Sequence, residues 1–284
     1  MVKNKKEPEK KQKRKITGAD MLAELDFPAY SHIPFIKCSY DYYSKGFEKL
    51  VDFYIKLASG SAKGEAGFAV RFLLARCVND LATGFHLATH GYVIQAHSVL
   101  RSIFESLDKI ELFSSNKEYA KIWVNNQKKS RNKLSPSGVR KLLKKDKEDI
   151  YTKMYGFFCE LGPHPTFSSS KTMSYVKESS GGKKQIIVKI GPTDLVHPIL
   201  FILVFCFLLM MSVSLSITKH LEAKENEERE LLFFQFRIMN DFFENCAKPA
   251  FIKYDGKLLH EFQKILADLE KQKEYLESEH QASL

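Results

Sequence analysis

The sequence lacks the short motifs that would assign it to a common enzyme class. It contains no glycine-rich phosphate loop, no HExxH pair for zinc and no GxSxG turn around a nucleophilic serine. It has no internal repeat, and only one of its 284 residues is tryptophan. No short motif therefore names a reaction, and we expect neither a cofactor nor a metal ion.

Cysteine is also sparse, and its spacing shows no CxxC pair. Widely separated cysteines are typical of buried thiols in a reducing compartment, whereas a disulfide scaffold has many cysteines in a short chain. We therefore expect free thiols and a cytoplasmic protein. The five cysteines are Cys38, Cys77, Cys159, Cys206 and Cys246.

Acidic residues are fewer than basic ones, and the formal net charge is +10. Residues 1–15 contain eight Lys or Arg and two Glu, and no apolar run follows them, so we do not expect a secretory signal. A run of this kind predicts a disordered, solvated basic tail. The alternative is an arm that binds nucleic acid, because clustered cations neutralise backbone phosphates.

Long hydrophobic runs are rare, and residues 199–217 form an uncharged stretch of 19 residues. A helix that spans a membrane needs about 20 apolar residues, so a span is one interpretation. The other is the central helix of a soluble bundle, buried on all sides. The flanks show no clear positive-inside asymmetry, and the second half carries serines, which favour the core helix. These serines are Ser212, Ser214 and Ser216.

Apolar periodicity predicts a mostly α-helical bundle with one small β-hairpin. We expect a tail at 1–15, a bundle at 16–250 with the hairpin near 173–190, and a C-terminal helix within 251–284 that packs on the bundle. Predicted helices are 40–57, 65–86, 92–113, 118–127, one that starts at Ser135-Pro136, 148–161, a long apolar helix from 199 towards 243, and 258–276.

Glycine and proline positions predict where these helices stop. Pro28 and Pro34 are expected to keep residues 16–36 free of helix, and Gly91 to separate the second helix from the third. The Lys248-Pro249 step is expected to end the long apolar helix.

Polar residues recur along the segment that follows residue 89. His90, His97, Arg101 and Asp108 stand at intervals of 7, 4 and 7, which places them in one strip of a helix. Glu105 lies one turn after Arg101. The two form either an ordinary exposed ion pair or an anion site, in which Arg101 holds phosphate and Glu105 orients Arg101.

Two further groups could contact a substrate or move a proton. His164 stands between Pro163 and Pro165, which restrict the backbone on both sides. It either caps a neighbouring helix or acts as a general acid or base. Arg76 and Asp80, one turn apart, form an intrahelical ion pair or contribute to substrate binding.

Histidines also come close to one another at His86, His90 and His97. His86 and His90 are one turn apart and could present two imidazoles to a metal. No third ligand stands at a suitable spacing, so we interpret these histidines as structural and predict no metal site.

The order of these parts resembles a known family. The segment RSIFE runs from Arg101 to Glu105, Tyr151 and Tyr155 follow on a predicted helix, and His164-Pro165 comes next. This order resembles an uncharacterised bacterial family of helical proteins with an R-S-x-x-E element and a tyrosine-bearing helix that ends in histidine. That family is related to the HEPN superfamily, whose members include metal-independent ribonucleases of toxin–antitoxin and phage-defence systems. The resemblance covers roughly residues 65–165.

The resemblance implies a HEPN-like bundle, often dimeric, in which Arg101, Glu105 and His164 are catalytic. His97, Asp80, Arg76 and Tyr155 would then bind the substrate. HEPN ribonucleases carry Arg and His a few residues apart. Here no His follows an Arg at that spacing, so any site is split between two segments.

Three functions follow as expectations. The first is an RNA-binding or RNA-cleaving effector in a toxin or phage-defence context, a metal-independent ribonuclease if it is an enzyme. Its partners would be RNA, a second copy, or a partner protein of a defence or toxin–antitoxin system. The second is a non-catalytic helical interaction module. The third is a membrane-attached effector that uses residues 199–217 as a span.

Overall fold

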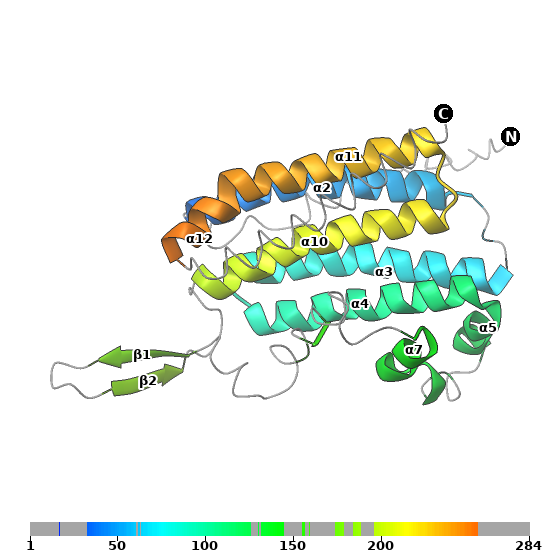
Figure 1. The fold of residues 1–284 in the computed structure, drawn as a ribbon, viewed down its shortest axis with the longest axis horizontal. Helices are drawn as coiled ribbons and strands as arrows, with labels where there is room; N and C mark the ends of the chain where they lie inside the picture. The colour runs from blue at the N-terminus through cyan, green and yellow to red at the C-terminus, as the bar shows by residue number, and fades with distance from the viewer. Residues whose placement is uncertain are drawn as a thin grey trace, which may run out of the picture.

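A computed structural model describes residues 17, 33–60, 62, 64–125, 130, 132–144, 155–156, 159, 174–178, 184–188 and 196–254. The described part is mostly helical, which confirms the prediction of a helical bundle. Five long helices lie side by side (Figure 1): α2 Pro34–Ala58, α3 Gly64–Thr89, α4 Val93–Ser115, α10 Val196–His220 and α11 Glu225–Phe242. The shorter helices are α5 Lys117–Asn125, α7 Pro136–Leu142, the π-helix η1 Phe243–Ala247 and α12 Lys248–Tyr254.

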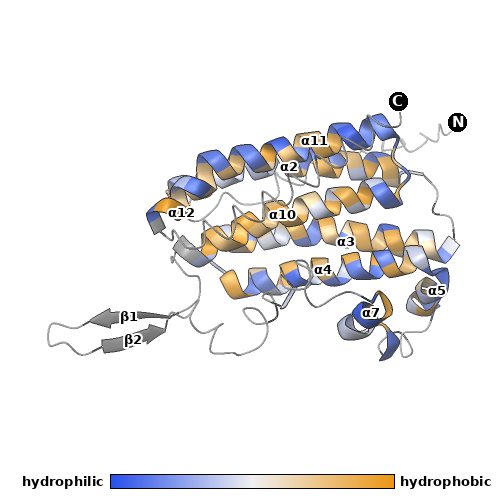
Figure 2. Ribbon diagram, viewed as in Figure 1, coloured by the Kyte–Doolittle hydropathy of each residue, from blue (hydrophilic) through white to orange (hydrophobic). Residues whose placement is uncertain are grey.

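Helix α10 forms the centre of the bundle. It packs against α2, α3, α4 and α11, and 78% of its most apolar window is buried. Figure 2 shows α10 hydrophobic along almost its whole length, whereas α11 is hydrophilic along most of its visible side. A helix that is apolar all round is expected where neighbours cover every side. By length and composition alone, the stretch Pro198–His220 is also able to cross a membrane.

Local signals set several helix ends. Ser135 caps α7, because its side chain accepts a hydrogen bond from the backbone N–H of Gly138. Gly91 has φ +78° in the turn between α3 and α4, a conformation that suits glycine. Pro34, however, was expected to prevent a helix and instead begins α2. The first position of a helix tolerates proline, since its missing N–H has no intrahelical partner there.

The expected single long helix from 199 towards 243 is two helices. α10 ends at His220, and Glu222 adopts φ +54° before α11 begins at Glu225. Residues 222–228 offer no apolar face to continue the packing of α10, so the chain reverses there. Glutamates in the first turn of α11 suit the positive end of its helix dipole.

The Lys248-Pro249 step also does not end the helical path. The backbone N–H of Lys248 bonds to the carbonyl of Phe243, five residues back, in the π-helix η1. Pro249 then occupies the first turn of α12, where a missing N–H is tolerated.

One pair of cysteines contradicts the expectation of free thiols. Cys38 of α2 and Cys246 of η1 form a disulfide, with their Cα atoms 6.1 Å apart. They are 208 residues apart in sequence, so only the return of α11 along α2 brings them together. Cys77 and Cys206 are buried free thiols, and burial raises the pKa of Cys77 to about 12.

Two short strands, β1 Ser174–Glu178 and β2 Lys184–Val188, pair antiparallel, with Ser174 opposite Val188. Residues 179–183 between them lie outside the described residues, so the hairpin as a whole stays a prediction. The tail at 1–15, most of the helix expected at 148–161 and the helix at 258–276 also fall outside the described residues.

Candidate functional site

The expected pair of Arg101 and Glu105 lies on α4 at the edge of the core. The Nε of Arg101 donates to Oε1 of Glu105 over 2.9 Å. Their side chains are 21% and 22% exposed, so the pair is neither free in solvent nor sealed in the core. This partial burial strengthens the pair relative to an exposed one and leaves an edge that a ligand can reach.

Tyr155 joins this pair from a separate segment. Its hydroxyl donates to Oε1 of Glu105 over 3.2 Å, and the Arg101 guanidinium lies 5.5 Å from the centre of its ring. Burial, and then the charge of Glu105, raise the pKa of the Tyr155 hydroxyl, which therefore stays protonated. The structure thus brings Arg101, Glu105 and Tyr155 together.

Arg140 of α7 completes the cluster, and sequence reasoning missed it. Its guanidinium carbon lies 3.6 Å from the centre of the Tyr155 ring, and its Nε donates to Oδ2 of Asp108 over 3.1 Å. The Asp108 side chain is 3% exposed and that of Arg140 14%. Nη2 of Arg140 is buried with no hydrogen-bond partner among the described residues. No spacing rule links α7 to α4, so only packing could reveal this contact.

We call Arg101, Glu105, Asp108, Arg140 and Tyr155 the α4 cluster. Within it, two guanidinium groups stand beside one tyrosine ring. Each guanidinium is also tied to a carboxylate of α4. The arrangement can bind an anion through planar guanidinium N–H groups, while the phenol of Tyr155 donates its proton to Glu105 in a hydrogen bond.

A second polar link lies beside the cluster, between α3 and α4. The Ser102 hydroxyl donates to Oδ2 of Asp80, and Nε of Arg76 lies 3.4 Å from the same oxygen. Arg76 is 52% exposed, so its guanidinium is accessible from solvent. Nearby, burial lowers the pKa of Lys109, with Glu105 opposing that effect. Arg76 and Asp80 therefore adjoin the α4 cluster through Ser102, the neighbour of Arg101.

His97 is not part of the cluster. It lies one turn before Arg101 but is 1% exposed, and burial lowers its pKa to about 3. The imidazole is therefore neutral and enclosed by the core. The prediction that His90 lies on the same helix as His97, Arg101 and Asp108 is wrong. His90 lies in the turn after α3, where its Nδ1 is 2.8 Å from the carbonyl oxygen of His86.

His164 and Tyr151 lie outside the described residues, so the split arrangement of Arg101 and His164 stays a prediction. Within the described ranges, no group of three or more His, Cys, Asp or Glu side chains is placed to hold a metal ion.

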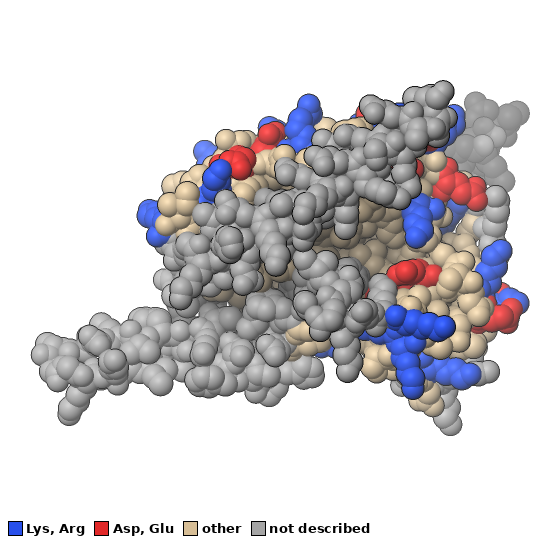
Figure 3. Space-filling view, in the orientation of Figure 1, with Lys and Arg blue, Asp and Glu red and all other residues tan. Residues whose placement is uncertain are grey.

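Positive charge surrounds the α7 side of the cluster. Residues 132–144 contain four cations and no acid: Lys133, Arg140, Lys141 and Lys144. Figure 3 shows Lys and Arg side chains gathered where α7 lies in Figure 1. Such a surface attracts polyanions.

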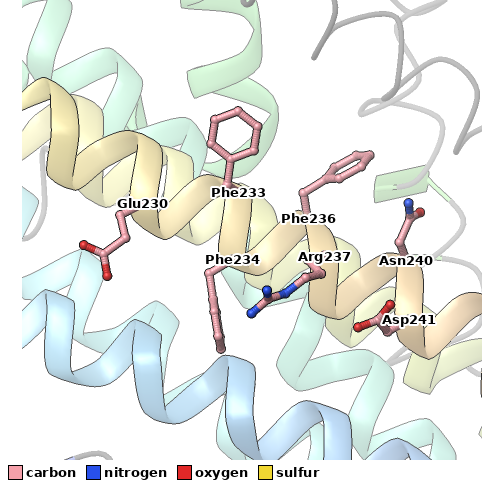
Figure 4. A pocket seen from close by; sticks show the side chains of 7 residues that line it. All are labelled: Glu230, Phe233, Phe234, Phe236, Arg237, Asn240 and Asp241. Atoms are coloured by element: carbon pink, nitrogen blue, oxygen red, sulfur yellow. The ribbon is translucent and has the colours of Figure 1, made fainter.

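A cavity of about 640 Å³ lies elsewhere, along α11. In Figure 4, Phe233 and Phe236 point to one side of α11, while Phe234 and Arg237 point to the other, towards α2. Its lining does not include a residue of the α4 cluster. The described residues that line it are Glu230, Phe233, Phe234, Phe236, Arg237, Asn240 and Asp241.

Comparison with protein-family models, curated proteins and solved structures finds no match to this chain. The functional assignment therefore depends on the geometry of the α4 cluster.

Proposed function

We propose that the α4 cluster binds the phosphate backbone of RNA, and that the protein is a HEPN-like effector of a toxin or phage-defence system. The observation that supports this is the placement of Arg101 and Arg140 beside the ring of Tyr155. Guanidinium groups bind phosphate oxygens through paired N–H donors, and the surrounding surface of α7 is basic.

The residues of the cluster have distinct roles in this proposal. Arg101 contacts the phosphate, and Glu105 orients Arg101 through their 2.9 Å hydrogen bond. The raised pKa of Tyr155 keeps its hydroxyl protonated, and that hydroxyl donates to Glu105, so Tyr155 helps to hold the carboxylate that orients Arg101. Nη2 of Arg140 has no hydrogen-bond partner among the described residues, so it is a further candidate donor to the phosphate.

If the protein cleaves RNA, His164 moves the proton. The imidazole takes the proton of the 2′-hydroxyl that attacks phosphorus, or supplies one to the oxygen that leaves. An imidazole near neutral pKa suits both steps. Arg101 stabilises the charge that develops on the phosphate, so the reaction needs no metal ion.

We further propose a cytoplasmic protein in which α10 is a core helix, with a second copy or a defence-system protein as partner. The burial of 78% of its apolar window supports the core helix, whereas the Cys38–Cys246 disulfide is unusual for the reducing cytoplasm. Recovery of the protein in the soluble fraction without detergent is the expected result. Recovery only with membranes would favour the alternative of an effector anchored through residues 199–217.

A second candidate is a non-catalytic helical interaction module. The polar contacts that favour it join different helices: Ser102 to Asp80 across α3 and α4, and Arg140 to Asp108 across α7 and α4. Satisfied networks of this kind can serve only to specify packing.

The test is cleavage and binding of labelled single-stranded RNA in EDTA by wild type, Arg101→Ala and His164→Ala. Arg229→Ala is the matched control, because Arg229 forms an i,i+4 pair with Glu225 on exposed α11. We expect both site variants to lose cleavage and Arg101→Ala to lose affinity, while the control behaves as wild type. Binding without cleavage by wild type would support an RNA-binding protein.

Equal RNA cleavage by wild type and both site variants would exclude this chemistry. A lower melting temperature for Arg101→Ala, in a protein that neither binds nor cleaves RNA, would instead support the interaction module.

A further inference from the structure

Helix α3 exposes two neighbouring phenylalanines. Phe68 is 54% exposed and Phe72, one turn later, is 53% exposed, and their ring centres are 6.3 Å apart. With about half of each side chain exposed, both positions forgo part of the hydrophobic stabilisation that full burial gives. Scattered exposed apolar residues are ordinary, but adjacent aromatic rings on one helix face indicate a contact surface.

The Phe72 ring of this pair packs against the core through other aromatic rings. The Phe72 ring lies 5.8 Å from Trp123 of α5, and Trp123 lies 5.8 Å from Phe113 of α4. Phe113 is fully buried, so a chain of rings connects the exposed pair to the core. A rigid aromatic surface loses little conformational entropy when a flat ligand stacks on it.

The same face of α3 leads towards the α4 cluster. Phe68, Phe72, Arg76 and Asp80 follow one another at intervals of four residues, about 6 Å each along a helix. Arg76 is half exposed, and Asp80 accepts the hydroxyl of Ser102, next to Arg101. The aromatic pair is therefore followed along α3 by a solvent-accessible cation, Arg76, beside a polar contact with α4.

We propose that Phe68 and Phe72 are a stacking platform for the bases of single-stranded RNA. The backbone of that RNA then passes Arg76 to reach Arg101. The inference rests on the proposed function and adds to it the preference for a single strand. Exposed aromatic rings beside cations are how proteins bind single strands without reading their sequence. A duplex keeps its bases stacked inside, so it offers no base face to the two rings. The half-exposed guanidinium of Arg76, next in the row, favours a polyanion over an apolar protein surface.

The experiment measures fluorescence anisotropy of a labelled 12-nucleotide single-stranded RNA and of a duplex of equal length. It compares the full-length wild-type protein with Phe68→Ala, Phe72→Ala, the double variant, Phe72→Trp and Arg76→Ala, each at several salt concentrations. Phe233→Ala is the matched control, because Phe233 is 49% exposed on α11. Thermal melting of each variant confirms that it folds.

We expect each alanine substitution on α3 to weaken single-strand binding by roughly five- to 150-fold. Phe72→Trp retains affinity because the indole also stacks, and the Phe233→Ala control binds as wild type. Duplex affinity stays within about twofold in all variants. The salt dependence is unchanged in the phenylalanine variants, since no cation is removed, and is reduced in Arg76→Ala.

Failure of the platform and failure of the proposed function give different results. Wild type that binds no RNA overturns the proposed function, and the platform with it. If wild type binds RNA and Phe68→Ala and Phe72→Ala bind it equally tightly, the platform alone is overturned. Sedimentation velocity covers the remaining case: loss of self-association in the double variant, with unchanged RNA affinity, would show an interface between copies and overturn the platform.

Discussion

The groups buried around α10 are mainly apolar, whereas the α4 cluster buries charged groups. Around α10 the buried groups are rings and aliphatic chains, such as Phe207 stacked on Phe242 with centres 3.9 Å apart. On α4, Asp108 is a carboxylate with 3% exposure that pairs with the guanidinium of Arg140. Apolar burial is favourable without any partner, whereas a buried charge is tolerated only with one. Damage to the first region should therefore reduce stability alone, and damage to the second should also change ligand binding.

The largest expected effect is in the core around α10. Phe207→Ala removes a ring that stacks on Phe242 and meets Tyr43 edge-on. We expect the free energy of unfolding to fall by about 3–5 kcal/mol, the usual range for a buried phenylalanine. Urea unfolding measures this. A loss below about 1 kcal/mol would mean that α10 is not packed in the core as described.

The disulfide tests how firmly α11 and η1 are held to α2. Cys38→Ser, or reduction of the native protein, is expected to lower the free energy of unfolding by about 2–4 kcal/mol, because the bond closes a long loop. Thiol titration of the unreduced, denatured protein should find three reactive cysteines. Five reactive cysteines, with no response to reductant, would restore the expectation of free thiols.

The third effect compares a buried ion pair with an exposed one. Arg140→Ala removes the guanidinium that pairs with the buried Asp108 carboxylate. We expect the free energy of unfolding to fall by roughly 2–3 kcal/mol, less than for a fully sealed pair. Arg229→Ala breaks a pair whose side chains are 44% and 69% exposed, which is worth about 0.5 kcal/mol or less.

The RNA affinities of Arg140→Ala and Arg229→Ala should also differ. The affinity should fall in Arg140→Ala and stay unchanged in Arg229→Ala. Similar losses of stability in the two variants would show that the burial of Asp108 has no energetic consequence.

A pH dependence that comes from His97 has almost no effect on stability at neutral pH and grows as the pH falls. Burial lowers its pKa to about 3 from the ordinary value near 6.5, so the folded state disfavours the proton that the unfolded state binds. The stability contributed by neutral His97 is therefore complete above pH 6.5 and is lost as the pH falls towards 3. In this window we expect the free energy of unfolding to fall by about 1.4 kcal/mol for each unit by which the pH falls.

Urea unfolding between pH 7.5 and 5 measures this slope. In His97→Gln the slope should be smaller by that amount, while the slope from other groups remains. Identical slopes in the two proteins would contradict the buried, neutral imidazole.

Local patterns predicted much of the fold. The periodicity of apolar residues located α3, α4 and α5 within a few residues, and Ser135 marked the start of α7. The pairing of Arg101 with Glu105 also followed from the spacing of four residues. The prediction that proline ends a helix is wrong at Pro34 and Pro249, because both residues occupy tolerated positions in a first turn.

Contacts between distant segments could not be predicted. Arg140 and Asp108 are 32 residues apart, and Asp80 and Ser102 are 22 apart, with no repeating pattern to connect them. The exposure of Phe68 and Phe72 also has no sequence signal, because apolar residues at this spacing equally suit a buried face.

By itself, the sequence determined which segments are helical and which charges pair within one helix, since both depend on neighbours three or four residues away. Only the tertiary structure decided that Arg140 meets Tyr155, that Cys38 meets Cys246, and that α10 is enclosed by four other helices. These outcomes depend on which helix faces pack together, and that choice is made by the burial of apolar surface over the whole chain.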